Sequence, residues 1–325
     1  MKRVFALVLA LCMMLALCAA ASADKTYELK LSTTQTDTSM IYAGMKAAAD
    51  KIEADTDGHV KVTIYPSSQL GAEEDMIDQA LQGMNIAVLT DAGRLSSYVH
   101  DMGIMNMAYF VNTYDDGCAV MATDTFKGWD EALAAEGLRG LCYNYYDGAR
   151  SFCGHEAWTT PEALKGVVIR TPGAAPYSKS IEALGATPYN IGWGEVYNGI
   201  QTKAIDGCEA QFTSLVSSKI YEVCEFCSKT EHINLFNMVV CGETWFNTLP
   251  EEYQEIVKKD FYDCAYESAK AVEAAQEDMA KTLTENGMEI VEVDRAAFEK
   301  AAEKAYEELG WTELREQLYV EAGLK

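Results

Sequence analysis

Hydrophobic positions in the first third of the chain alternate between the spacing of strands and that of helices. Val60, Val62 and Ile64 alternate with polar residues, which is the pattern of a half-buried strand. The same criterion, together with turn residues at the boundaries, predicts strands at 27–31, 60–64 and 86–89 and helices at 39–54 and 73–82.

The same rhythm returns in the middle and at the end of the chain. Strands are predicted at 140–146, 167–170, 187–191 and 288–293. Helices are predicted near Pro161, at 176–184 and at 296–309. Repeated strand–helix units favour an open α/β architecture with largely parallel strands.

One predicted helix is unusually long. Thr248-Leu249-Pro250-Glu251 has the pattern of a capping box with proline in the first turn. No proline or glycine interrupts the helical composition from Glu251 to Asn286. About 36 residues at 1.5 Å each would reach about 54 Å, which exceeds the width of one small domain. We therefore expect a helix that runs across two domains, either continuous or with a kink or break.

The first 23 residues have the pattern of an export signal. Lys2 and Arg3 precede an apolar run over 4–20, and Ala-Ser-Ala occupies 21–23. This order predicts a signal peptide at 1–23, cleaved during secretion, and a mature protein in the periplasm or another extracytoplasmic space. A retained membrane anchor and a lipid anchor at Cys18 are the alternatives. The lipid anchor is less favoured because a leucine, rather than a small residue, precedes Cys18.

Length and charge limit the partners of the mature chain. The 325 residues suggest about two domains. There are 26 basic and 50 acidic residues, and loss of the two basic residues of the signal peptide changes the net charge from −24 to −26. Such an acidic protein is a poor partner for nucleic acid or for an anionic membrane surface. No later stretch is apolar for long enough to span a bilayer.

The cysteines allow several interpretations. Cys224-x-x-Cys227 follows the helix-like segment 219–223, where a spacing of three places both thiols on one face. The pair could be redox-active or form half of a zinc site, but no second C-x-x-C follows. Small buried thiols are the favoured interpretation. The pairing of the eight mature cysteines is left open: Cys118, Cys142, Cys153, Cys208, Cys224, Cys227, Cys241 and Cys264.

Motifs for catalysis and for metal or cofactor binding are incomplete. His155-Glu156 begins like a zinc-protease helix but lacks the second histidine. The chain has no G-x-S-x-G elbow and no Gly-Lys dipeptide, so the serine-hydrolase and P-loop patterns fail. We predict no catalytic residues, no metal and no cofactor. An exported α/β enzyme remains an alternative without a recognisable set of catalytic groups.

Several short motifs occur together in order along the chain. They are YPSSQLG at 65–71, LKGVVIRTP at 164–172, LGATP at 184–188, EVY at 195–197, DGCE at 206–209 and FNTLP at 246–250. This series resembles the signature of the solute-binding proteins of TRAP transporters, the DctP family. The resemblance covers essentially the whole mature chain.

The resemblance implies a two-domain fold of the type II-like periplasmic-binding-protein kind, with a ligand cleft between the domains. We predict one domain from 24–148 with 236–276, and a second from 149–235 with 277–325. The implied function is capture of a carboxylate-containing organic acid and its delivery, by a monomer, to a TRAP permease driven by an ion gradient. A ligand-binding protein that serves a sensor is the alternative.

The resemblance also assigns residues to the cleft. Arg170 is expected to pair with the ligand carboxylate, because a guanidinium presents a rigid pair of donors to two carboxylate oxygens. From residue type alone, a structural ion pair is the alternative for Arg170. Arg150 matches a second arginine that lines the cleft. Trp193 stands where the family has an aromatic wall, although it could instead be a core aromatic.

Further cleft positions follow from sialic-acid-binding members of the family: Thr34, Glu73, Asp91 and Arg94. Glu73 and Asp91 could instead be exposed loop acids. Many members have an asparagine after the DGCE motif, but this chain has Ala210 followed by Gln211, which we include among the predicted ligand-binding residues. Loss of that asparagine argues against sialic acid and indicates a different support for the ligand.

Overall fold

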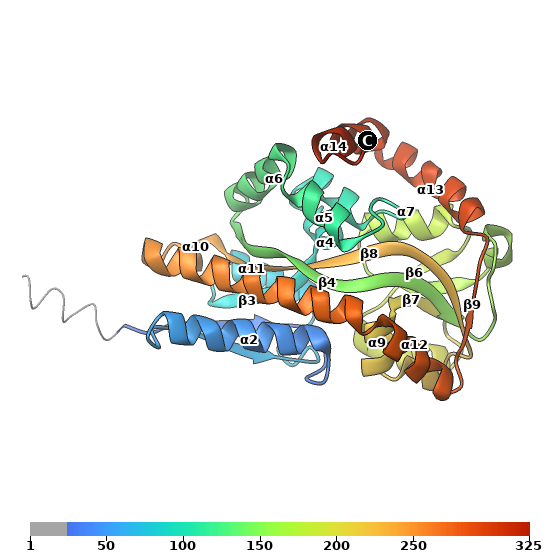
Figure 1. Cartoon of the computed structure of the whole chain (residues 1–325), viewed down its shortest axis with the longest axis horizontal. Helices are drawn as coiled ribbons and strands as arrows, with labels where there is room; N and C mark the ends of the chain where they lie inside the picture. Colours follow the sequence, from blue (N-terminus) through green and yellow to red (C-terminus); the bar gives the residue numbers. More distant parts are fainter. Residues whose placement is uncertain (1–24) are drawn as a thin grey trace, which may run out of the picture.

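The computed structural model describes residues 25–325, so the predicted signal peptide and Cys18 lie outside the described residues. Residues 25–325 contain a mixed sheet with the order β2-β1-β3-β8-β4-β7-β5-β6, and β9 pairs with β8 (Figure 1). Its nine strands are β1 (Tyr27–Ser32), β2 (Val60–Tyr65), β3 (Ile86–Asp91), β4 (Leu138–Gly154), β5 (Val168–Thr171), β6 (Thr187–Asn190), β7 (Gly207–Gln211), β8 (Phe226–Gly242) and β9 (Glu289–Val291).

The helices cover the two faces of this sheet. The α-helices are α2 (Met40–Asp55), α3 (Glu73–Leu81), α4 (Ala92–Leu95), α5 (Tyr114–Met121), α6 (Asp124–Ala135), α7 (Ala175–Ala183), α8 (Val196–Gln201), α9 (Phe212–Ser217), α10 (Glu243–Phe246), α11 (Glu251–Ala274), α12 (Gln276–Glu285), α13 (Arg295–Leu309) and α14 (Thr312–Glu321). The 3₁₀ turns are η1 (His100–Asn106), η2 (Pro161–Leu164), η3 (Trp193–Glu195) and η4 (Ile220–Glu222). The prediction of an α/β fold is confirmed.

The expectation of a largely parallel sheet is wrong at its centre. The outer pairs β1–β2, β1–β3, β5–β6 and β5–β7 are parallel, as the strand–helix rhythm indicates. The two central strands, β4 and β8, are antiparallel to each other, and each is 17 residues long. The strand predicted at 140–146 covers less than half of β4, and β8 was not predicted. Both are buried on two faces, so they lack the alternation that marks a half-exposed strand.

β4 and β8 connect the two halves of the molecule. β8 pairs with β3 through its last residues, whereas β4 pairs with β7 through residues 150–154. Gly148 of β4 lies opposite Leu235 of β8, beside a shift in register, and has a positive φ of 99° that favours glycine. The two predicted crossings between domains, after 148 and after 235, therefore lie side by side.

The predicted long helix is broken. It consists of α11 and α12, which meet at Ala275 and change direction there (Figure 1). In a continuous helix the Val272 carbonyl would accept from the Gln276 amide. Here it accepts from the Gln276 side chain at 3.0 Å and from the Ala275 amide at 3.3 Å, so a side chain enters the hydrogen-bond ladder. The predicted capping box is also wrong, because Pro250 is the N-cap and the Thr248 hydroxyl donates to Trp245 O.

Buried apolar side chains form three separate clusters. The largest lies between strands β1 to β3 and the helices α2 and α11. These two helices pack side by side. The other two lie around β5 with α7 and α13, and around β7 with α9 and α12. The predicted division places α14 in the second domain, yet Trp311 and Leu318 pack in the largest cluster, with the first half of the chain. The boundaries of the two domains stay a prediction.

The helical context expected for Cys224-x-x-Cys227 is wrong. Cys224 follows η4, and Cys227 lies in β8. Cys227 is opposite Cys153 of β4, which is in turn opposite Cys208 of β7, and all four thiols are buried in one apolar cluster. The cysteines of the described residues are free thiols. None of the helices within residues 25–325 combines the length and apolar character needed to cross a bilayer.

Candidate functional site

The eight residues predicted for the cleft all line one cavity. They are Thr34, Glu73, Asp91, Arg94, Arg150, Arg170, Trp193 and Gln211. The cavity is partly open to solvent. Its wall combines residues from both predicted domains. Positions that are far apart in the sequence thus meet at one site, although ligand binding by these residues stays a prediction.

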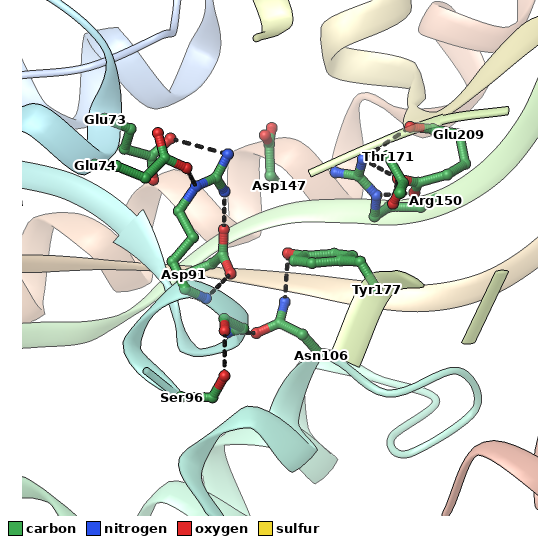
Figure 2. A network of polar contacts seen from close by, with 12 residues as sticks. Glu73, Glu74, Asp91, Ser96, Asn106, Asp147, Arg150, Thr171, Tyr177 and Glu209 are labelled. Atoms are coloured by element: carbon green, nitrogen blue, oxygen red, sulfur yellow. Dashed lines mark hydrogen bonds and ion pairs between the residues drawn. The ribbon is translucent and has the colours of Figure 1, made fainter. Parts of the chain in front are cut away.

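Arg94 is held by three carboxylates. Its guanidinium lies 2.9 Å from Glu74, 2.5 Å from Asp91 and 3.5 Å from Glu73. The three carboxylates are labelled in Figure 2. Asp91 ends β3 and caps α4 by accepting from the Arg94 amide, and Glu73 is the first residue of α3. Neither acid is an exposed loop residue. Burial raises the pKa of Glu73 to about 7, because it outweighs the opposing charge of Arg94, and Asp91 adds a smaller contribution in the same direction as burial.

Arg150 is also paired. From β4 its guanidinium donates to both carboxylate oxygens of Glu209, one at 2.8 Å, and to the Glu209 backbone oxygen at 2.8 Å (Figure 2). Glu209 is fully buried and also accepts from the Thr171 hydroxyl at 3.2 Å. Burial would raise the pKa of Glu209, but the charge of Arg150 and its hydrogen bonds lower it to about 2. The charge of Arg150 is therefore neutralised within the protein.

Arg170 differs from every other arginine of residues 25–325. It is the one arginine with no carboxylate oxygen within 4.0 Å, although its side chain is 2% exposed. Its Nε donates to the Ile191 carbonyl at 3.0 Å, which leaves both Nη groups without a protein acceptor. Burial, reinforced by the nearby Arg150, lowers the pKa of Arg170 to about 10. The structural ion pair considered for Arg170 is not present.

Trp193 forms a wall beside Arg170. The Arg170 guanidinium carbon lies 5.3 Å from the centre of the indole ring, within the range of a cation–π contact. The indole Nε1 donates to the Ser218 hydroxyl at 3.1 Å, which fixes the plane of the ring. Trp193 is half-buried and lines the cavity, so it is not a core aromatic. Arg170 is thereby held in place by a backbone carbonyl and an aromatic face.

Asp147 is a cavity residue that the sequence analysis did not single out. It lies in β4, is fully buried, and accepts on one oxygen from Gln35 at 2.9 Å and from Gln211. In Figure 2 it stands between Glu74 and Arg150. Asp147 directly follows Tyr145 and Tyr146 and stands three residues before Arg150, which is the only local signal for it. Its two glutamine partners are remote in sequence, so their convergence was not predictable.

The arrangement of charges in the cavity suits an anionic ligand. Two arginines are satisfied by acids of the protein, and the third has free donors in a cavity with an aromatic wall. Among residues 25–325 no group of three or more histidine, cysteine, aspartate or glutamate side chains could hold a metal ion. A cavity lined from both halves of an α/β chain is typical of a small-molecule site.

Comparison with known proteins identifies the family. Residues 31–311 match the model of the bacterial extracellular solute-binding proteins, family 7 (DctP). The chain belongs to this family, which is made up of solute-binding proteins of TRAP transporters rather than enzymes.

Individual relatives cover most of the chain. The sialic acid-binding periplasmic protein SiaP of Vibrio cholerae is 26% identical over 90% of this chain and 92% of its own. The 2,3-diketo-L-gulonate-binding periplasmic protein YiaO of Escherichia coli is 28% identical over 83% and 82%. A TRAP solute-binding protein of Ochrobacterium anthropi, solved with bound L-fuconate, has a TM-score of 0.87 at 29% identity and covers 91% of this chain and 99% of its own. These proteins confirm the predicted fold class.

Proposed function

We propose that this protein is exported, captures a carboxylate-containing organic acid in the cavity around Arg170 and delivers it to a TRAP permease in the membrane. The observation that carries the proposal is the free pair of Nη groups on a buried, oriented arginine. A buried charge without a counter-ion is costly in a folded protein. Arg170 is retained at that cost because a ligand carboxylate supplies the missing partner.

Similarity supports the class of ligand. Sialic acid, 2,3-diketo-L-gulonate and L-fuconate, the ligands of the three relatives, are all carboxylates. The fork of two parallel hydrogen bonds between guanidinium and carboxylate would account for that shared feature. The missing asparagine after DGCE distinguishes this chain from sialic-acid binders, so the remainder of the ligand is expected to differ.

Export and the permease partner rest on the sequence and the family. The signal-peptide pattern at 1–23 and the periplasmic location of the relatives support an extracytoplasmic protein. Membership of the family, whose solved members are TRAP solute-binding proteins, supports ligand release to a membrane permease. Closure of two domains around the solute would carry the ligand to the permease in a bound form.

The proposal is tested by binding and by uptake. Purified mature protein is screened by thermal shift against organic acids, and each hit is recovered to establish that it is chemically unchanged. Arg170→Met should abolish the shift, whereas Arg139→Met, which alters an arginine paired with Glu243 outside the cavity, should leave it intact. Cells that contain the cognate permease should take up the same acid with the wild-type protein and not with Arg170→Met. Binding without uptake would favour a sensor, and turnover of the acid would favour an enzyme.

A further inference from the structure

Four cysteines meet where strands β7, β4 and β8 run side by side. Cys153 of β4 lies directly opposite Cys208 of β7 on one side and Cys227 of β8 on the other. Directly opposite residues of neighbouring strands have their side chains on the same face of the sheet. Cys224, in the segment between η4 and β8, packs in the same apolar cluster. All four residues are at most 2% exposed, and none of them lines the cavity around Arg170.

The arrangement of these thiols fits disulfides rather than a metal ion. Among residues 25–325 no group of three or more cysteine, histidine, aspartate or glutamate side chains could hold a metal. Opposite residues of an antiparallel pair have Cα atoms about 4.5–5.5 Å apart. This separation lies inside the range of about 4.4–6.8 Å that a disulfide spans. Cys153 can therefore bond to Cys208 or to Cys227 without movement of the backbone.

The order of the strands excludes one of the possible pairings. Because β4 separates β7 from β8, Cys208 and Cys227 are two strand spacings apart, about 9.5 Å. That distance exceeds the limit of about 7 Å between the Cα atoms of a disulfide. Cys153 must then bond to one of its two neighbours, and Cys224 is left to bond to the other.

Interactions between the thiols favour one of the two remaining pairings. Burial, with a further contribution from the Cys227 thiol, raises the pKa of Cys153. Interaction with the Cys208 thiol, followed by burial, raises the pKa of Cys224. In both cases the other thiols of the cluster contribute less. Since the thiolate is the reactive form, these raised pKa values also make the folded, reduced cluster inert, so oxidation belongs to the time of folding.

We propose that the four thiols form two disulfides, Cys153–Cys227 and Cys208–Cys224, as the chain folds in an oxidising compartment. The oxidant is another disulfide, and one cysteine thiolate attacks it, releases a thiol and forms a mixed disulfide. The second cysteine thiolate attacks the protein sulfur of that bond and releases the second thiol. Each new bond passes two electrons to the oxidant, and the two cysteine protons end on the released thiols. The bonds would tie together β4 and β7, which carry Arg150 and Glu209, with β8 and the segment before it.

Refolding in two redox buffers tests the pairing. Mature protein is unfolded and reduced, and is then refolded with reduced glutathione alone or with a mixture of reduced and oxidised glutathione. Free thiols are alkylated in denaturant, and the unreduced peptides are mapped by mass spectrometry. With reduced glutathione alone, all eight thiols should be alkylated. With the mixture, peptides should be joined as Cys153–Cys227 and Cys208–Cys224, and the melting temperature should be about 5 °C or more above that of the reduced protein.

Two other buried cysteines on the same strands are the internal control. Cys142 of β4 is opposite Val239, and Cys241 of β8 is opposite Arg139, so neither directly faces a thiol and both should stay alkylated. A second control is oxidised glutathione added to the folded, reduced protein. It should oxidise the cluster at least about tenfold more slowly than during refolding, because buried thiols with a raised pKa supply few thiolates.

Two variants test the bonds separately. Cys227→Ala should keep the Cys208–Cys224 bond and leave Cys153 alkylated, whereas Cys224→Ala should keep the Cys153–Cys227 bond and leave Cys208 alkylated. The proposal is overturned by four free thiols in the cluster after oxidative refolding, by a Cys153–Cys208 bond in the wild type, or by an oxidised protein that melts below the reduced one. The wild-type peptide map decides the pairing even where a variant does not fold.

Discussion

Replacing Arg170 and Arg150 by methionine should have opposite consequences for the ligand-free protein. Both are buried arginines in one cavity, but Arg150 is paired with Glu209 and Arg170 has no acidic partner. Methionine keeps most of the apolar length of arginine and removes the charge. The comparison therefore isolates how much the positive charge at each position contributes to the stability of the ligand-free protein.

The structure gives the size of each effect. The lowering of the Arg170 pKa to about 10 corresponds to about 3 kcal/mol of cost for keeping it charged in the apo protein. Loss of the Ile191 hydrogen bond and the Trp193 contact offsets about 2 kcal/mol of the gain. Arg170→Met should thus leave the melting temperature unchanged or raise it slightly. Arg150→Met leaves Glu209 buried without its partner, at about 3–5 kcal/mol, and should lower the melting temperature by about 10 °C.

Ligand binding should show the reverse dependence for Arg170. Two charge-assisted hydrogen bonds of about 1.5–3 kcal/mol each imply at least about a hundredfold rise in Kd for Arg170→Met. Differential scanning calorimetry of the apo variants and isothermal titration with the hit from the acid screen measure both quantities. The reasoning would be refuted if Arg170→Met destabilised the apo protein as much as Arg150→Met, since Arg170 would then have a structural partner. Retained affinity in Arg170→Met would refute its role in binding.

Three further predictions concern other features. Because Glu73 is buried with a pKa raised to about 7, it takes up a proton as pH falls through 7, and anion affinity should rise between pH 8 and 6 in titrations of the wild type but not of Glu73→Gln. In the native, reduced protein a maleimide reagent should label only the half-buried Cys118 and Cys264. In denaturant, mass spectrometry should find all eight thiols labelled. Labelling of a buried thiol in the native protein as fast as Cys118 or Cys264 would contradict the packing. Gly117→Ala places a Cβ 2.1 Å from the buried ring of Phe236, so the free energy of unfolding should fall by about 1–3 kcal/mol in chemical unfolding. In the control Gly128→Ala the new Cβ has nothing within 4 Å, so the free energy of unfolding should rise by about 0.5–1 kcal/mol.

Net charge and local charge have different roles in this protein. The mature chain carries −26, so its overall field opposes an anionic ligand. Most acids lie on exposed helix faces, where solvent and salt screen them. Arg170 itself is buried in the wall of the cavity, where the field of a single guanidinium is much less screened. The acidic composition excludes nucleic acid as an expected partner, while the site is defined by one local group.

Local patterns determined much of the fold. The alternation at 60–64 became β2, and Ser39 caps α2 by accepting from the Tyr42 amide at 3.1 Å. These elements depend on neighbours in sequence, so propensity and spacing are sufficient to predict them. The central strands were not predicted in full, because a strand that is buried on both faces lacks the alternation of polar and apolar residues. The break at Ala275 also has no sequence signal, since it depends on how one glutamine side chain bonds.

The family resemblance that the ordered motifs carry assigned eight residues to one site, and all eight line the cavity. The resemblance singled out Arg170 for the ligand carboxylate, but the sequence could not show which of the three cavity arginines is already paired with an acid of the protein. That depends on the distances between side chains from different strands, such as Arg150 of β4 and Glu209 of β7. The same holds for Asp147, whose free oxygen is defined by glutamines at 35 and 211. Sequence therefore determined the residue types and the family, and tertiary contacts decided which of the buried charges are paired within the protein and which are not.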